Sequence, residues 1–320
     1  MDPLWIVIII LISYIVLYDI LRPLVVYGVI SNILLKHHLV RKDKNHWARG
    51  QCSDPTNYEQ MKMWETGLEW ADKNKDKCHE VSIESDGFKL FGEFYDFKKD
   101  MTVMIIPGRT ETLQYSYFYA TAYEKLGFNI FVMDKRAHGN SDGKFEDCGQ
   151  YSYVDFIRWA ELLHNQFNCD DITIHGICVG CAPATFALAN ENCPPYIKRF
   201  VADGMFRTFS ETFKNHMLLD KRAIFPALPF MIMRAKLQLK IDIRTNGPIY
   251  QIGKVKVPTL FIYTMLDKFS TPEQAKALYE KCGAEKKKLV FFEHGGHSHI
   301  LYNNPEEYVE TIDKFIKETA

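Results

Sequence analysis

The sequence has almost no net charge and few cysteines for its length. Its 320 residues include 39 Lys and Arg against 40 Asp and Glu, a formal net charge of −1 at pH 7. A whole-chain nucleic-acid surface needs a basic excess, so this balance argues against nucleic acid as a partner. Eight cysteines fall far below the density of a disulfide scaffold, and their spacing shows no framework, which favours a reducing compartment.

Internal repeats and low-complexity tracts are also missing. With 47% hydrophobic and 25% charged residues, the composition is that of an ordinary globular protein and excludes a disordered or collagen-like chain. The length corresponds to about two domains, or to one α/β domain with insertions. Nothing in the sequence indicates an oligomeric state.

The N-terminal segment lacks charge altogether. Residues 3–18 read PLWIVIIILISYIVLY, and with the residues up to position 22 they just suffice for a helix across a hydrocarbon core of about 30 Å. A signal peptide needs a positively charged start and a small-residue cleavage site, and neither is present. The sequence therefore predicts an uncleaved transmembrane anchor over residues 1–22.

Cations flank this segment on one side only. No Lys or Arg precedes it, whereas five follow closely: Lys36, Arg41, Lys42, Lys44 and Arg49. By the positive-inside rule we expect a single-pass membrane protein with its C-terminal bulk in the cytoplasm. Residues 23–77 are predicted to be an interfacial helix and a charged linker with one amphipathic helix; a second span at 23–35, the alternative, would reverse the topology.

From residue 78 onward the pattern becomes that of a folded domain. Residues 80–90 alternate in period two around Asp86-Gly87, which predicts a hairpin. Short apolar runs follow at 102–107, 129–134, 171–177, 199–205, 258–264 and 288–294, with helical patterns between most of them. This alternation predicts an α/β fold with a largely parallel sheet and helices on both faces, over residues 78–320. Only residues 206–248 break the rhythm.

The turn after the run at 171–177 has the spacing of a nucleophile elbow. It reads Gly176-Ile177-Cys178-Val179-Gly180, in which glycines flank the central residue two positions away on each side. A sharp strand-to-helix turn holds that residue at positive φ, and a helix N-terminus favours the thiolate form of a cysteine. Cys178 is therefore the candidate nucleophile.

Two loops after later strands supply an acid and a base. Asp267 follows the run at 258–264 and His297 follows the run at 288–294, and the order nucleophile, acid, base is that of the α/β-hydrolases. In this triad Cys178 attacks, His297 transfers the proton and Asp267 orients His297. The backbone N–H groups of Val179 and Arg109 are predicted to form the oxyanion hole.

From about residue 80 to the C-terminus the chain resembles an α/β-hydrolase of the serine-aminopeptidase-like group, in particular the small membrane-anchored bacterial members with a short lid. The segments that carry the resemblance are IIPGRTE, FVMDKRAHGNSDG, ITIHGICVGCAPA, TLFIYTMLDKFSTP and GGHSHILYNNPEEYVETIDKFI, in the family's order. The resemblance implies the α/β-hydrolase fold with a short helical lid at about 206–248. It also implies a structural role for Asp134, in the loop after the fourth strand.

Two departures from the family pattern fall at the catalytic centre. Pro107-Gly108 stands where the family has His-Gly, and Cys178 stands where it has Ser. Dienelactone hydrolases and polyhydroxyalkanoate synthases, which share the fold, use Cys at this position. We expect hydrolysis of ester or thioester acyl groups through a covalent acyl-enzyme, without metal or organic cofactor. An acyltransferase on the same triad, or a catalytically silent binding protein, is the alternative.

Other readings of the same residues stay open. Cys178-x-x-Cys181 also fits a redox pair, although Cys181 is better explained by packing. His294, His297 and His299 suggest a metal site only weakly. The Arg109 side chain either faces solvent or selects an anionic substrate. The segment 206–248, with eight Lys or Arg against three Asp or Glu, is either a solvated linker or a lid on an anionic membrane surface.

Overall fold

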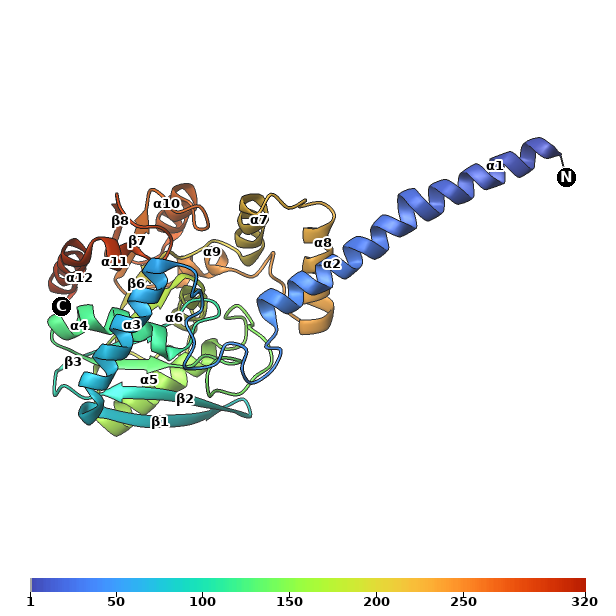
Figure 1. Ribbon diagram of the computed structural model, residues 1–320. Coiled ribbons are helices and arrows are strands. Elements are labelled where there is room, and N and C mark those ends of the chain that lie inside the picture. The colour runs from blue at the N-terminus through green and yellow to red at the C-terminus, as the bar shows by residue number, and fades with distance from the viewer. Residues whose placement is uncertain (1) are drawn as a thin grey trace.

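The computed structural model describes residues 2–320, and it contains one eight-stranded sheet (Figure 1). The strand order is β1-β2-β4-β3-β5-β6-β7-β8; β2 runs antiparallel to β1 and β4, and all other neighbours are parallel. The strands are β1 (Cys78–Ser85), β2 (Phe88–Tyr95), β3 (Met101–Ile106), β4 (Phe128–Met133), β5 (Asp171–Ile177), β6 (Ile197–Asp203), β7 (Thr259–Thr264) and β8 (Lys287–Phe292). The predicted α/β-hydrolase fold is confirmed, including the hairpin at Asp86-Gly87, where both residues have positive φ.

The helices cover both faces of the sheet and extend beyond it. They are α1 (Pro3–Tyr14), α2 (Arg22–Leu39), α3 (Tyr58–Lys73), α4 (Leu113–Lys125), α5 (Tyr153–Phe167), α6 (Cys181–Leu188), α7 (Phe209–Leu219), α8 (Ala227–Arg234), α9 (Pro248–Gln251), α10 (Pro272–Lys281), α11 (Ile300–Asn303) and α12 (Pro305–Thr319). A π-helical stretch, Ile15–Leu21, joins α1 to α2, and a second one, Ala235–Leu239, follows α8. Three short 3₁₀-helices lie at Lys75–Lys77, Cys178–Gly180 and Ile252–Lys254.

Two hydrophobic cores lie on opposite faces of the sheet. One forms between the sheet and α5, α6, α9 and α10, with Trp159 and Phe200 among its buried side chains. The other forms between the sheet and α3, α4, α11 and α12, with Tyr119 and Tyr308 at its centre. Because strands buried on both faces must be apolar throughout, the continuous apolar runs of the sequence follow directly from this layering.

Helix α3 is part of the folded body. The predicted division assigned its residues to a linker, but Met63 and Trp70 are buried against α4 and the second core. The indole N–H of Trp70 donates to Glu124 of α4 at 2.6 Å. The amphipathic pattern that predicts this helix therefore reflects docking onto the sheet layer.

The N-terminal segment forms one continuous helix from Pro3 to Leu39, which projects from the body as a single rod (Figure 1). Its most apolar 18-residue window has a mean hydropathy of 2.6 and no buried residue, so length and composition make it a candidate membrane span. Residues 23–35, predicted as a separate interfacial helix, continue the rod. Pro23 fits at this point because it lies within the first turn of α2, just after the π-helical stretch.

A third hydrophobic cluster ties the rod to the segment between β6 and β7. Leu34, Leu35 and Leu39 of α2 are buried against α7 and α8, together with Phe213 and Met231. This cluster reaches Val179, directly after Cys178. The C-terminal end of the rod therefore packs beside the elbow.

Candidate active site

Strand β5 leads into a tight turn with Cys178 at its centre. Cys178 has a φ of +50°, a conformation uncommon for a residue other than glycine. A Cβ on Gly180 would overlap the carbonyl oxygens of Ile106 and Pro107, and one on Gly176 would lie 2.8 Å from the Cys181 backbone. Both positions thus require glycine, and the structure contains the elbow that the spacing predicts.

His297 and Asp267 lie together beyond the C-terminal ends of β8 and β7. His297 Nδ1 is 2.6 Å from Asp267 Oδ2, with 15% of the His297 side chain and 1% of the Asp267 side chain exposed. The other carboxylate oxygen of Asp267 accepts the backbone N–H groups of Phe269 and Ser270, each at 2.8 Å. The carboxylate is therefore held on both oxygens, and it fixes the orientation of the imidazole.

The electrostatics of His297 link it to Cys178. Burial lowers the pKa of His297, but the hydrogen-bonded Asp267 and the nearby Cys178 raise it well above the ordinary value. The ring thus carries a proton readily while its two nitrogens face an acid on one side and a thiol on the other. The structure brings all three predicted triad residues together.

A cavity of about 400 Å³ lies over Cys178. Gly108, Arg109 and Val179 line it together with Cys178, so both residues predicted to supply oxyanion N–H groups border this cavity. Helix α7 forms the opposite wall with Phe209, Thr212, Phe213 and His216. Burial lowers the pKa of His216 to about 4, so its imidazole is neutral at pH 7.

The loop that carries Gly108 is fixed by buried charges. Lys135 Nζ donates to the Gly108 carbonyl at 2.9 Å and to Glu146 at 2.8 Å. The backbone N–H of Gly108 donates to Glu111 at 2.8 Å. Asp134, in the segment before Lys135, accepts from the backbone of Leu113 at 2.9 Å and from Arg49 at 2.7 Å, which anchors the neighbouring loop.

Glu111 and Gln60 belong to the cavity although sequence reasoning gave them no role. Both line it, and the Gln60 amide donates to Glu111 at 3.3 Å. Burial raises the pKa of Glu111 to about 7. Glu111 follows the IIPGRT segment closely and could have been singled out there, whereas Gln60 comes from α3, and only its tertiary docking brings it to the site.

The N-terminal rod contacts a residue of this cavity through its last turn. Arg109 Nη1 donates to His38 Nδ1 at 3.1 Å, and the His38 ring packs 5.1 Å from that of Phe213. Burial lowers the pKa of Arg109, and in the described part of the chain no carboxylate forms a salt bridge with it. The cavity therefore contains a desolvated cation whose hydrogen-bond partner is an imidazole.

The remaining candidates have structural surroundings. The Cys181 thiol is buried and donates to the Gly176 carbonyl at 3.0 Å, and all eight cysteines are free. His299 contacts Glu59 and Gln60, each at 2.8 Å, while His294 is exposed. Among residues 2–320, no group of three or more His, Cys, Asp or Glu side chains is arranged to hold a metal ion.

Comparison with known proteins agrees with the fold. A family model described as the alpha/beta hydrolase fold matches residues 102–223. The protein YqkD of Bacillus subtilis (strain 168) is 30% identical over 217 residues, which are 67% of this chain and 70% of YqkD. The chain belongs to the α/β-hydrolase superfamily. Hydrolase is accordingly its general enzyme class.

This α/β-hydrolase also resembles solved esterases in fold. The Pyrococcus furiosus esterase Pf2001 superposes with a TM-score of 0.65 at 21% identity, covering 78% of this chain and 94% of the esterase. The esterase EaEST of Exiguobacterium antarcticum gives 0.55 at 18% identity, over 75% of this chain and 100% of EaEST. At these identities the likeness concerns the fold alone.

Proposed function

We propose that this hydrolase cleaves ester or thioester acyl groups through a Cys178–His297–Asp267 triad. The observation that carries the proposal is the elbow itself: a cysteine at positive φ at the end of β5, electrostatically coupled to a histidine that is hydrogen-bonded to a buried aspartate. A thiolate paired with an imidazolium is an activated nucleophile. The esterase names of the structural neighbours lend support to an ester substrate.

The reaction proceeds in two balanced steps. Cys178 Sγ attacks the acyl carbonyl carbon, the bond to the leaving alcohol or thiol breaks, and His297 gives that leaving group its proton. Water then attacks the thioester while His297 accepts a proton from it, and the carboxylic acid and the Cys178 thiolate are released. The backbone N–H groups of Val179 and Arg109 stabilise the oxyanion in both steps.

The segment 206–248 acts as the lid of this site. Helix α7 supports this role, because four of its side chains line the cavity over Cys178. We propose in addition that the Arg109 guanidinium binds an anionic group of the substrate. An unpaired cation in a desolvated cavity costs free energy, which a substrate carboxylate or phosphate would recover.

The rod at residues 3–39 anchors the enzyme in a membrane as a single pass, with the catalytic domain in the cytoplasm. At about 1.5 Å per residue its 37 residues span about 55 Å, well beyond a hydrocarbon core of about 30 Å. Its first twenty residues or so suffice to cross the core, and the rest forms the stalk that packs on the lid.

A panel of esters and thioesters of increasing acyl-chain length tests the proposal. Cys178→Ala should turn these substrates over at least about 10³-fold more slowly than the wild type, because the nucleophile is removed. Cys181→Ala, which alters a buried thiol three residues away, is the matched control and should retain turnover. Undiminished turnover in Cys178→Ala would overturn the mechanism. Transfer of the acyl group to an added alcohol instead of water would identify an acyltransferase.

Labelling with a thiol-directed probe separates the enzyme from a silent binding protein. Cys178 should react faster than Cys181, and His297→Ala should slow the reaction of Cys178, because the base that takes up the proton of the thiol is gone. Equally slow labelling of both cysteines would indicate a catalytically silent protein.

A further inference from the structure

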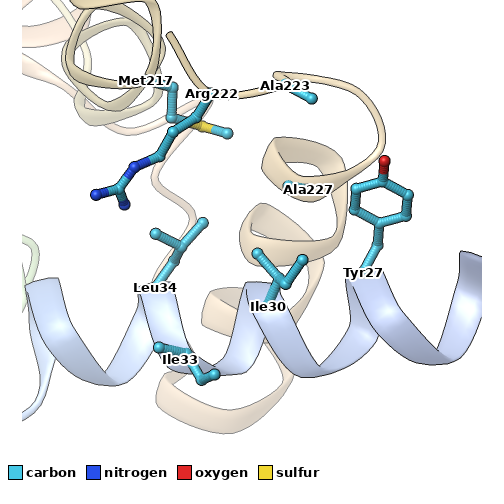
Figure 2. A pocket seen from close by; sticks show the side chains of 8 residues that line it. All are labelled: Tyr27, Ile30, Ile33, Leu34, Met217, Arg222, Ala223 and Ala227. Atoms are coloured by element: carbon cyan, nitrogen blue, oxygen red, sulfur yellow. The ribbon is translucent and has the colours of Figure 1, made fainter. Parts of the chain in front are cut away.

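A second cavity, of about 390 Å³, lies between the anchor rod and the lid (Figure 2). Its lining is apolar except for one hydroxyl and one guanidinium. Tyr27, Ile30, Ile33 and Leu34 of α2 form one side, and Met217, Arg222, Ala223 and Ala227 form the other. Figure 2 shows Tyr27, Ile30 and Leu34 directed from the rod toward the loop that carries Arg222 and Ala223. We call this cavity the rod–lid groove.

The groove results from small side chains in a fixed interface. Ala223 and Ala227 have short side chains where the lid faces Ile30, so the wall opposite the rod is recessed. Beside it, Arg234 of α8 donates from Nε to Ser31 Oγ at 3.1 Å and holds the lid to the rod. Buried leucines of α2 complete the contact. The groove is thus bounded by packed elements on both sides.

The surroundings of the groove have the chemistry of a membrane surface. The apolar residues of the rod before Tyr27 are almost all exposed, as a bilayer-embedded helix requires. Phe225, between the two lining alanines, is 79% exposed, and Leu218 and Leu219 are 54% and 42% exposed. Lys221 and Arg222 lie between these apolar residues in the sequence, and Arg222 pairs with the half-exposed Asp220 at 3.2 Å, a surface contact that a lipid phosphate would have to displace or share. Exposed apolar groups beside cations are typical of segments that insert at an anionic lipid interface.

The position of the groove along the rod also agrees with a site at the membrane surface. If residues 3–22 cross the hydrocarbon core, Tyr27 follows about 7 Å later, at the level of the lipid headgroups. The groove therefore opens where an acyl chain can leave the bilayer while its headgroup stays at the interface.

Helix α7 separates this groove from the catalytic cavity. His216 lines the cavity over Cys178, and the next residue, Met217, lines the groove. The two cavities therefore share one wall that is a single helix thick.

We propose that the rod–lid groove binds one acyl chain of an anionic phospholipid from the membrane, with Arg222 beside the phosphate. The volume falls within the range of about 300–1,000 Å³ that is usual for ligand sites. An acyl chain that moves from the bilayer into an apolar groove gains little hydrophobic free energy, because both surroundings are apolar. The favourable free energy comes from the groove walls, which water would otherwise contact. The proposal rests on membrane anchoring and does not require the catalytic activity.

Photo-crosslinking of the full-length protein in lipid vesicles tests whether the rod–lid groove binds an acyl chain. The vesicles contain phosphatidylcholine and phosphatidylglycerol, with a diazirine in the acyl chain of a fraction of the phosphatidylglycerol. Irradiation should crosslink groove residues within 27–34 and 217–227 as well as the exposed rod. Ala227→Trp, which fills the groove, should reduce crosslinking in 217–227 by about tenfold. Val29→Trp, whose native side chain is 55% exposed on the same rod, is the matched control and should leave it unchanged.

A second variant guards against misfolding, because Ala227 is buried. Ile30→Trp fills the groove from the rod, where the native side chain is 37% exposed, and should cause the same loss. Crosslinking before residue 27 serves as the internal reference for insertion. Wild-type crosslinks confined to that exposed stretch, or undiminished groove crosslinking in both variants, would overturn the proposal. Equal groove crosslinking from labelled phosphatidylcholine would overturn the assignment of Arg222.

Discussion

Two buried carboxyl groups, Glu111 and Asp203, lie beside the candidate triad, and burial raises the pKa of each to about 7. Asp203 ends β6 and is fully buried; one of its oxygens accepts the Tyr308 hydroxyl at 2.6 Å, and the other has no hydrogen-bond partner among residues 2–320. A buried carboxylate without full hydrogen bonding is costly, so burial favours the neutral acid and raises the pKa.

Asp203→Asn should therefore flatten the dependence of stability on pH. Folding raises the pKa of Asp203 from 3.8 to about 7. The neutral acid therefore adds to the free energy of unfolding in full below pH 3.8, and this contribution is lost as the pH rises through 7. Between pH 5 and 8 the wild type should lose stability relative to Asp203→Asn, by an amount of the order of a few kcal/mol. Thermal unfolding at several pH values measures this, with the exposed Asp76→Asn as control. Parallel curves for the wild type and Asp203→Asn would contradict it.

Arg109 allows a prediction about specificity. Arg109→Gln keeps the backbone N–H of residue 109 but removes the cation, so the ratio of kcat/KM for an ester with a terminal carboxylate to that for its neutral analogue should fall about tenfold or more. The loss should lie mainly in KM. Arg244→Gln, an exposed cation outside the catalytic cavity, is the control. An unchanged ratio in Arg109→Gln would show that the guanidinium does not bind the substrate.

At the scale of the elements, the turn after β6 packs against His297, the histidine of the candidate triad. Gly204 has a φ of +63°, and a Cβ there would lie 3.1 Å from His297 Cε1 and 3.3 Å from Nδ1. The close approach of this backbone to the imidazole limits how far the ring can shift from Asp267. Glycine is needed here for its conformation and for its size.

Gly204→Ala should consequently reduce kcat/KM by about 10- to 100-fold, because a small displacement of a catalytic group is costly. Gly127→Ala is a matched control: it has the same kind of backbone, with a φ of +77°, but nothing lies within 4 Å of the added Cβ. Both variants should lose about 1 kcal/mol of stability to backbone strain. Equal activity in the two variants would show that Gly204 does not position His297.

These elements also show what the sequence could and could not predict. The parallel strands, the elbow around Cys178 and the loops with Asp267 and His297 were predictable, because each is encoded locally by apolar runs, glycines and chain order. The contributions of Gln60 and His38 were not, because their contacts with Glu111 and Arg109 join residues 51 and 71 positions apart. No periodicity or motif encodes such tertiary docking.

At the scale of the whole molecule, the rod and the catalytic domain form one unit. Two of the five cations used to infer the orientation are engaged by the domain: Arg41 donates to the carbonyls of Gly139 and Ser141, and Arg49 pairs with Glu93 and Asp134. These two arginines, which follow the rod in the sequence, thus also hold its C-terminal end against the catalytic domain. If the chain were cleaved after about residue 22, as a signal peptide is, only the exposed part of the rod would be removed.

Membrane anchoring predicts that the full chain stays in the membrane pellet after alkaline carbonate extraction, because a spanning helix is not released by charge screening. Sequencing of the N-terminus of the extracted protein should begin before Pro3. A mature protein that begins after about residue 22, or one released by carbonate, would contradict the anchor. The double variant Ile9→Lys and Ile12→Lys should shift to the soluble fraction, because two charges in the hydrocarbon core are costly.

The most direct test of the central claim is the intact mass of the enzyme after a brief reaction with an acyl thioester or a p-nitrophenyl ester. The mass should increase by one acyl group, and the acyl group should map to the peptide that contains Cys178. It should be absent in Cys178→Ala, and in the wild type water should cleave it as His297 accepts the proton. Turnover without any acyl group on Cys178, at an undiminished rate in Cys178→Ala, would contradict the account.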